Sequence, residues 1–258
     1  MKKVNFSKWM MWVTALYLIL PLVLTFLYSF SSEWINVLPT GFTFKYYMQI
    51  LPRQDFYMSL ARTLLICVLT IVLAGILMLL AMYVVTVYHP KFDKYLQILC
   101  MIPYALQGII IAISILTLYS GAKGLFGSRI IMLVGTYCII ILPYMYQGIR
   151  NALRAVSARE LIEAAQILGC TRFYAFFRII VPNILSGIII SSMLSMGIIF
   201  GDFVVVNVIA GSSYQTASMF LYKTMAQSGQ ATSVVIVVMF IITLILSTIA
   251  FKLRNKTH

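Results

Sequence analysis

The sequence predicts an all-α protein: a polytopic bundle of about six transmembrane helices that forms a single domain over residues 1–258. Composition is the first observation behind this prediction. The chain is 62% hydrophobic and 10% charged, whereas a soluble domain carries about 25% charged residues. Mean hydropathy is +0.99, and the apolar residues stand in long blocks that a water-facing fold could not bury.

Each apolar block is long enough to cross the hydrocarbon core, which is about 30 Å thick and needs about 20 helical residues. The predicted spans are residues 9–30, 63–87, 95–118, 130–147, 179–203 and 232–251. Peptide groups in lipid must find hydrogen-bond partners within the protein, and these blocks lack the alternating polarity of barrel strands, so we expect helices. The first block is too long for a cleaved signal peptide and is expected to be retained.

Basic residues predict the orientation of these spans. The formal net charge is +13, but Lys and Arg stand in short patches between apolar blocks, which disfavours a nucleic-acid surface. Thirteen of them fall at the N-terminus, between spans two and three, between spans four and five, and in the tail, against six on the other side. Because positive charge is retained in the cytoplasm, both termini are expected there.

The residue types needed for catalysis or metal binding are sparse. Cys67, Cys100, Cys138 and Cys170 include no CxxC pair, and three of them lie inside apolar blocks as small hydrophobic residues would. The two histidines are His89 and His258, and the glycine-containing stretch 121–128 has no lysine at the position that a phosphate-binding loop requires. We therefore expect no catalytic residue, no metal and no cofactor of the chain's own.

The segment between spans four and five, residues 150–178, is predicted to contain a short amphipathic helix. Ser157 and Glu160 have the spacing of a capping box at a helix start. Gly169 stands where a left-handed residue would end the helix, and Thr171 is placed to cap a second one. One face of the helix is predicted to carry Leu161, Ala164, Ala165 and Leu168.

Two roles are possible for that helix. A helix lying on the membrane presents large apolar side chains to lipid. The predicted face is made partly of alanines, which anchor poorly in lipid but allow a partner protein to approach closely. We therefore favour a helix that docks into a groove of another protein.

A family resemblance enters with these residues. Glu163-Ala164-Ala165, then Gly169 after three residues, then Ile179, Val181 and Pro182, resembles the EAA signature of binding-protein-dependent ABC importer permeases, with Val181 where the family has leucine. The resemblance implies the type I importer permease fold. It also implies a bacterial cytoplasmic membrane location and a role in forming the solute path.

In that family the loop forms a coupling helix that docks into the ATP-hydrolysing subunit. The resemblance implies that Glu163 makes a polar contact there, that Ala164 and Ala165 permit close packing, that Gly169 makes the turn and that Pro182 leads into span five. It further implies partners: two ATP-binding-cassette subunits that carry the ATP and Mg, a second similar permease or a second copy, an extracytoplasmic solute-binding protein, and membrane lipid. The chain itself is then not an enzyme.

The resemblance, over roughly residues 60–250, is closest to the spermidine/putrescine-type group, whose segment after span five is similar to residues 201–207 and 211–214. It implies transport of polyamines, or by the same machinery of ferric ion, thiamine or an aminoalkylphosphonate. Asp202, with Asn207 in the same segment, is the candidate for the substrate path, because an intramembrane carboxylate is costly and marks a pathway by default. Asp202 could instead sit hydrated at the interface, or pair with a partner's arginine.

Span five also carries small residues at four-residue spacing, at Gly187, Ser191 and Ser195 and at Gly197 with Gly201, which permit close helix packing, including packing across a permease–permease interface. Segment 204–231 begins apolar and is a candidate re-entrant or surface element.

Two other function classes have their own sequence signatures. An ion-coupled secondary transporter predicts inverted repeats, broken helices and several buried ionisable groups, and a membrane scaffold or sensor predicts an appended soluble domain.

Overall fold

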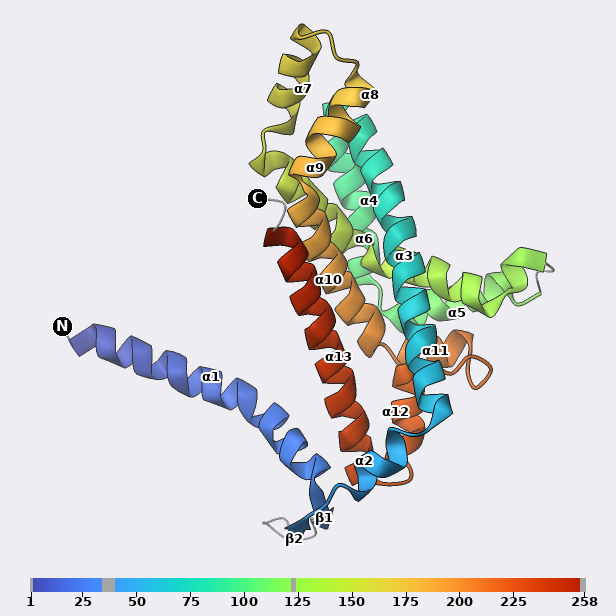
Figure 1. The fold of residues 1–258 in the computed structure, drawn as a ribbon. Helices are drawn as coiled ribbons and strands as arrows, with labels where there is room; N and C mark the ends of the chain where they lie inside the picture. The colour runs from blue at the N-terminus through green and yellow to red at the C-terminus, as the bar shows by residue number, and fades with distance from the viewer. Residues whose placement is uncertain (1, 34–39, 122–123, 256–258) are drawn as a thin grey trace. The chain divides into compact units, whose positions relative to one another are not determined.

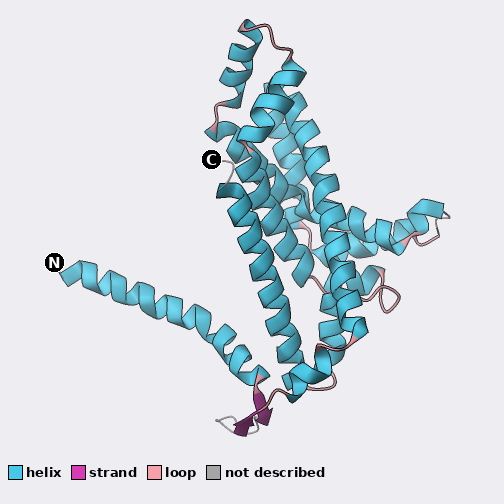
Figure 2. Cartoon of the chain, viewed as in Figure 1, coloured by secondary structure: helices cyan, strands magenta, loops and turns pink. Residues whose placement is uncertain are grey.

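The computed structural model describes residues 2–33, 40–121 and 124–255, which are helical apart from two short strands and the loops (Figure 2). The chain forms two compact units, Met1–Met58 with Phe220–Thr243, and Ser59–Met219 with Leu244–His258. The all-α fold class is confirmed. Helix α3 (Gln54–Val87), helix α12 (Ala217–Met225) and helix α13 (Gly229–Asn255) each contribute to both units.

The first unit begins with α1 (Lys2–Ser29) and an antiparallel pair of strands, β1 (Ser31–Glu33) and β2 (Thr40–Phe42), in which Ser31 pairs with Phe42. Helix α2 (Lys45–Ile50) follows. Aromatic rings pack the unit: Phe30 stacks on Tyr47 with ring centroids 4.9 Å apart, and Phe56 lies 5.2 Å from Phe220.

The second unit holds most of the helices. In chain order these are the rest of α3, η1 (Pro90–Phe92), α4 (Asp93–Ala105), α5 (Gly108–Tyr119), η2 (Gly124–Gly127), α6 (Arg129–Ala155), α7 (Ala158–Ile167), α8 (Arg172–Tyr174), the π-helix η3 (Ala175–Ile180), α9 (Val181–Asn183), α10 (Leu185–Gly201) and α11 (Val204–Ile209). Helix α6 is the centre of its core, since Leu133, Ile141, Met145 and Ile149 on it are fully buried.

Helices α6 and α10 lie side by side (Figure 1) and approach very closely. A Cβ added to Gly148 would stand 2.4 Å from the Ser191 Cβ, and one added to Gly187 would stand 2.4 Å from the Ala152 Cβ. Ser191 and Ser195 are buried, and their hydroxyls bond back to carbonyls of their own helix. Of the small residues predicted on span five, Gly187 and Ser191 therefore pack helix against helix within one chain, whereas a Cβ added to Gly197 or Gly201 would have no atom within 4 Å.

Two predicted spans are not straight. Span 95–118 is interrupted between α4 and α5, which meet at 96°, and span 179–203 is interrupted at Ile184 by a bend of 65°. In the first case Pro103 stands in the last turn of α4, and Leu106 and Gln107 take extended conformations, as residues that end a helix do. In the second, Pro182 and the π-helix η3 precede the break.

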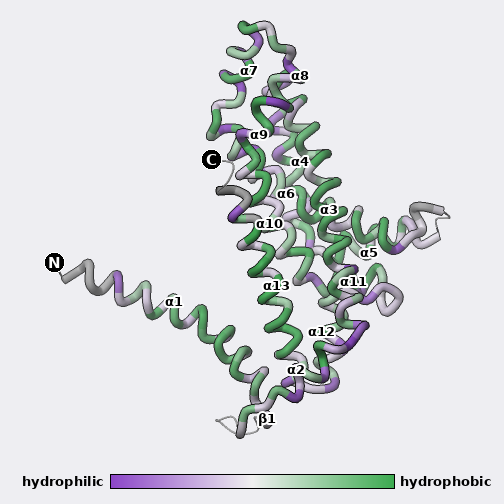
Figure 3. The backbone as a smooth tube through the Cα atoms, viewed as in Figure 1, coloured by the Kyte–Doolittle hydropathy of each residue, from purple (hydrophilic) through white to green (hydrophobic). Residues whose placement is uncertain are grey.

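The bends change how spans are counted. Among the described residues, four helices are long and apolar enough to cross a membrane: Lys8–Ser29, Gln54–Val87, Arg129–Ala155 and Gly229–Ile249. The number rises to as many as six if each bent pair is one span. The apolar character of these helices is visible along the tube in Figure 3.

We predict that Gly187→Ala destabilises the chain, because a methyl group there overlaps Ala152 and must push α10 away from α6. Overpacking of this kind costs about 1–3 kcal/mol. Gly197→Ala, on the same helix with no atom within 4 Å of the added Cβ, is the matched control and should be neutral or slightly stabilising. Thermal unfolding of the detergent-solubilised chain measures both; equal unfolding temperatures would contradict the close crossing.

Candidate functional site

The helix predicted between spans four and five is α7, which follows α6 after a two-residue elbow, Val156–Ser157. Ser157 is the N-cap residue, as predicted, but the capping box is wrong. Ser157 has φ 46° and ψ 48°, and its hydroxyl makes no capping hydrogen bond. Among the described residues it is the one non-glycine with positive φ. This left-handed residue turns the chain sharply out of α6.

The other end of α7 was predicted correctly. Gly169 has φ 86°, its N–H donates to the carbonyl of Gln166 at 2.9 Å, and the N–H of Cys170 donates to Ala165 at 3.0 Å. These two bonds form a Schellman motif, which requires a residue like glycine in the left-handed region. Thr171 then caps α8, its hydroxyl accepting from the N–H of Tyr174 at 3.3 Å.

Helix α7 has two different faces. Ala158, Ile162 and Ala165 are buried on the side packed against η3 and the end of α6. The opposite side carries exposed apolar side chains: Leu161, Ala164, Ile167 and Leu168. Ala165 was predicted to share a face with Leu161, Ala164 and Leu168 and does not, because it packs inside its own chain.

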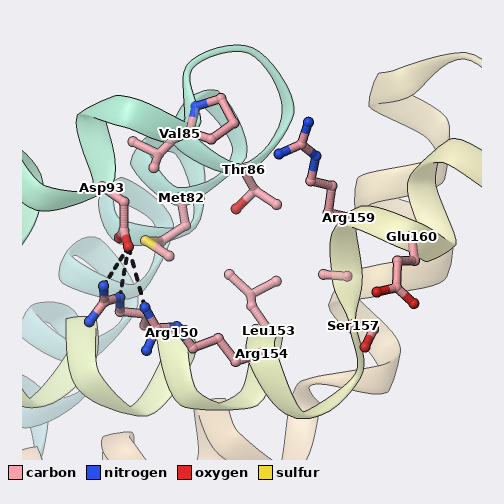
Figure 4. Close-up of a pocket in the computed structure, with 12 residues that line it drawn as sticks. Met82, Val85, Thr86, Asp93, Arg150, Leu153, Arg154, Ser157, Arg159 and Glu160 are labelled. Carbon is pink, nitrogen blue, oxygen red and sulfur yellow. Dashed lines mark hydrogen bonds and ion pairs between the residues drawn. The ribbon is translucent and has the colours of Figure 1, made fainter.

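Charged side chains border the exposed face. Arg159 donates to the Glu163 carboxylate at 3.0 Å, one helical turn apart, and both are exposed. Glu160 lies beside a hollow of about 230 Å³ at the base of α7 (Figure 4). The hollow is lined by Met82, Val85, Thr86, Pro90, Asp93, Arg150, Leu153, Arg154, Ser157, Ala158, Arg159 and Glu160.

At one side of this hollow, α6 holds the first residue of α4. Arg150 Nε donates to Asp93 Oδ2 at 3.0 Å, and the Tyr146 hydroxyl donates to Asp93 Oδ1 at 2.9 Å. Arg154 lies 3.7 Å from the same carboxylate. This network was not predicted from the sequence, although Asp93 stands at the edge of an apolar block and its three partners recur every four residues.

The candidate substrate residue Asp202 lies in the break between α10 and α11. Its side chain accepts the N–H of Val205 at 3.2 Å, and its carbonyl accepts the Ser218 hydroxyl at 2.9 Å. The buried Tyr137 hydroxyl is within electrostatic range of the carboxylate, without a hydrogen bond of normal geometry. Asp202 therefore has a local role as the cap of α11.

Helix α11 and Asn207 belong to the segment predicted as re-entrant or surface-lying. Val205, Val206 and Ile209 are buried, and α11 packs on α5 and α6. Asn207 is exposed and lines a second hollow, of about 520 Å³, with Arg129, whose guanidinium donates to the Ile209 carbonyl at 2.8 Å. Asp202 is not among the residues that line this hollow.

Pro182 stands in α9, between the π-helix and the 65° bend that precedes α10, so the entry into span five is bent rather than direct. Three of the cysteines, Cys67, Cys100 and Cys138, are buried, as predicted. Across the described ranges, no three His, Cys, Asp or Glu side chains lie close enough together to hold a metal ion.

An apolar helical bundle with a short helix standing between two of its spans defines a class, the polytopic helical membrane proteins. Residues 78–256 match the family described as "Binding-protein-dependent transport system inner membrane component". The chain belongs to this family, which confirms the resemblance to ABC importer permeases and its location in a membrane.

Relatives and solved structures agree on the class. The chain is 21% identical over 244 residues to a protein of Salmonella paratyphi A named as a 2-aminoethylphosphonate transport system permease, PhnV, covering 92% of this chain and 91% of that one. It is 23% identical to the spermidine/putrescine transport system permease PotC of Escherichia coli K12, covering 80% and 77%. These relatives are transport permeases, not enzymes.

Two crystal structures share the fold. A bacterial ABC transporter involved in import of the acidic polysaccharide alginate matches with TM-score 0.71 and 15% identity, over 98% of this chain and 96% of that one. The MetNI methionine ABC transporter matches with TM-score 0.66 and 15% identity, over 82% and 98%. The type I importer permease fold is thereby confirmed.

We predict that Ser157→Ala leaves α7 stable, within about 0.5 kcal/mol, because the hydroxyl makes no capping bond. Ser157→Gly should be neutral or stabilising, since glycine enters the left-handed region without penalty. Amide hydrogen exchange across α7 measures both. A capping box would instead make Ser157→Ala cost about 1 kcal/mol, and faster exchange in that variant would contradict the geometry described.

Proposed function

We propose that this importer permease has no ATP site of its own and is driven by a separate ATP-binding-cassette subunit, which docks on α7. The exposed face of α7 carries this proposal. Leu161, Ala164, Ile167 and Leu168 follow one side of a helix whose other side is already packed on its own chain. An amphipathic helix with such a face fits an apolar groove, read by anchors at i, i+3 and i+7.

The exposed face of α7 could instead lie on a lipid surface. Its large apolar side chains, Leu161, Ile167 and Leu168, favour that alternative more than the predicted face made partly of alanines did. Charge disfavours it. Lipid-lying helices are rich in Lys and Arg on the polar face, whereas α7 carries Glu160 and Glu163 against Arg159 alone. An anionic membrane surface attracts basic segments and gives no such attraction to this helix.

A rigid mounting is the second requirement of a coupling helix. The Schellman motif at Gly169 fixes the turn after α7, and the buried side chains Ala158, Ile162 and Ala165 pack α7 against η3. A displacement of α7 is therefore passed to η3 and on to α9 and α10. Transport then follows as alternating access: nucleotide-driven movement of the ATPases shifts α7 as a rigid body and the spans reorient the path.

The remaining parts of the machine belong to the same proposal. The solute path forms with a second permease, similar or identical, and an extracytoplasmic binding protein delivers the cargo. Both termini face the cytoplasm, as the distribution of Lys and Arg favours. ATP and Mg bind on the partner ATPases. An ion-coupled mechanism predicts broken helices, as found, together with several buried ionisable groups. It is less well supported, because Leu106, Gln107 and Ile184 at the two bends carry no ionisable group, which leaves Asp202 after α10, among the described residues, as a single acid at a break.

For the cargo we propose a small aliphatic amine, with polyamines as the first choice. Spermidine and 2-aminoethylphosphonate, named for the two relatives, both carry a primary ammonium group. Asp202, in the break after α10, offers the acid that such a cation needs. Arg129 beside Asn207 is unfavourable for a polyamine and would suit a phosphonate, so the two candidate path residues favour different cargoes.

We predict that Leu161→Asp combined with Leu168→Asp abolishes copurification of the ATPase, because both charges enter the docking face. Losing an anchor of this kind costs about 2 kcal/mol, or about 30-fold in Kd. Arg159→Ala, which breaks an exposed pair outside that face, is the control and should weaken binding far less. Pull-down from detergent, where lipid is absent, measures both; an ATPase bound equally well by the double variant would sink the proposal.

We predict that reconstituted uptake of labelled spermidine is inhibited by putrescine and little affected by 2-aminoethylphosphonate. Asp202→Asn keeps the acceptor that caps α11 but removes the charge. It should therefore lower uptake at least ~5-fold if the carboxylate meets the cation, as loss of a charged contact does. Unchanged uptake in this variant would show that Asp202 is only a structural cap. Inhibition by the phosphonate and not by putrescine would indicate that the cargo is an aminoalkylphosphonate.

A further inference from the structure

The carboxylate of Asp93 joins the beginning of α4 to the end of α6, next to the base of α7. Both of its oxygens are engaged: Oδ2 by Arg150 and Oδ1 by the Tyr146 hydroxyl. The Arg150 side chain is 17% exposed and that of Asp93 26% exposed, so the pair is more shielded than an ordinary surface ion pair. Figure 4 shows Asp93 and Arg150 meeting at one side of the hollow, with Ser157 and Glu160 at the other.

The partners of Asp93 form a ladder on one face of α6. Tyr146, Arg150 and Arg154 are spaced by four residues and therefore stand one above another along the helix. Arg150 is bonded, whereas Arg154 lies 3.7 Å from the carboxylate with its side chain 64% exposed. Arg154 is two residues before the Val156–Ser157 elbow at which α7 begins. One carboxylate thus has two arginines within reach, one helical turn apart.

The element held by this carboxylate is half of a bent pair. Helix α4 begins at Asp93 and meets α5 at 96° after Ala105. Helix α7 packs directly on η3, η3 contacts α9, and α9 contacts α10. Among the described residues, Asp93 makes the hydrogen-bonded link between α4 and α6 that lies nearest the α6–α7 elbow, and the Gln147–Met101 contact lies farther along α6.

We propose that Asp93 is a positioning residue for transport, which couples the movement of α7 and the end of α6 to the bent pair α4–α5. When α7 is displaced, the carboxylate passes from Arg150 to Arg154, whose guanidinium already lies 3.7 Å from it. Arg154 stands four residues, about 6 Å of helical rise, further along α6. One-turn shifts of packed elements between two discrete contacts are a known form of switching. This inference depends on the proposed function, because the displacement of α7 comes from the docked ATPase.

Cys100, buried in the middle of α4, provides the probe. A variant that keeps Cys100 and replaces the other three cysteines with alanine is purified with its ATPase and labelled with N-ethylmaleimide, without nucleotide and after trapping with ATP and orthovanadate. We expect the labelling rate to change about 5-fold or more between the two states, the lower end of typical coupling between sites. Asp93→Asn should abolish that change while the ATPase still copurifies.

Two further variants separate coupling from simple stability. Asp55→Asn removes the carboxylate of the Arg53–Asp55 pair, of length 2.6 Å, and should leave the labelling response intact. The charge exchange Asp93→Arg with Arg150→Asp should restore at least part of the response lost in Asp93→Asn. Thermal unfolding of each complex accompanies the labelling.

Each outcome has a distinct meaning. A labelling response in Asp93→Asn equal to that of the parent would overturn the inference, and so would a parent whose Cys100 does not respond to nucleotide. Loss of response in Asp93→Asn with a lower unfolding temperature and no rescue by the charge exchange would show a merely structural role and also overturn it. Absence of any ATPase from the parent preparation would contradict the proposed function instead.

Discussion

Hydrocarbon offers no water to a peptide group, and this constraint determines both where the chain is helical and where it can stop being so. A break in a spanning helix exposes N–H and C=O groups that must be satisfied by protein. At Leu106 the freed N–H donates to the carbonyl of Pro103 at 3.2 Å. At the end of α10, Asp202 accepts the N–H of Val205 and the Ser218 hydroxyl bonds the Asp202 carbonyl. The breaks are thus sites where side chains and short turns replace the helical ladder.

The second consequence concerns how helices pack. Lipid tails are as apolar as leucine, so helices associate in a membrane through close packing rather than through exclusion of water. The crossing of α6 and α10 at Gly148 and Gly187 is such a contact, with no room for another methyl group. It fixes the position of the long helix α6, and α6 in turn carries the elbow, the Asp93 network and the buried centre of the second unit.

The sequence was sufficient to predict the fold class, because composition and block length report directly on the solvent of the chain. It also located the helix between spans four and five and its end at Gly169, where the signal is local: one glycine in the left-handed region. The sequence failed at Ser157, because a serine before a glutamate three residues later suits a capping box equally well whether or not the backbone turns left-handed. It also failed at the bends. Hydropathy is continuous through Pro103 and Pro182 and does not record direction, although both prolines mark where a helix can end.

The face of α7 shows a different limit of sequence reasoning. The apolar residues of this helix cover a wide arc, with Arg159, Glu160 and Glu163 on the remainder, and periodicity alone assigned Ala165 to the same side as Leu161. Only the position of η3 decides that Ala158, Ile162 and Ala165 are covered, and η3 is a π-helix, whose wider turn no residue pattern announced. Helix α6 also extends beyond the predicted span 130–147. Arg150 and Arg154 end the apolar run, yet the helix continues through them to Ala155, with Arg150 bonded to Asp93 on another element.

A transport subunit needs stiff links and few joints, and the placement of polar and glycine residues in this chain meets that need. Coupling between distant sites is usually about 1–3 kcal/mol. It is lost if a helix that transmits a movement bends more easily than the turn that has to move. The links here are helices fixed by buried side chains or by a Schellman motif, and the joints are short: the Val156–Ser157 elbow, the turn at Leu106 and Gln107, and the bend at Ile184. A partly shielded ion pair suits a joint between two helices better than apolar packing does. It holds one arrangement through charge-assisted bonds, and it can exchange one arginine for the next without repacking a core.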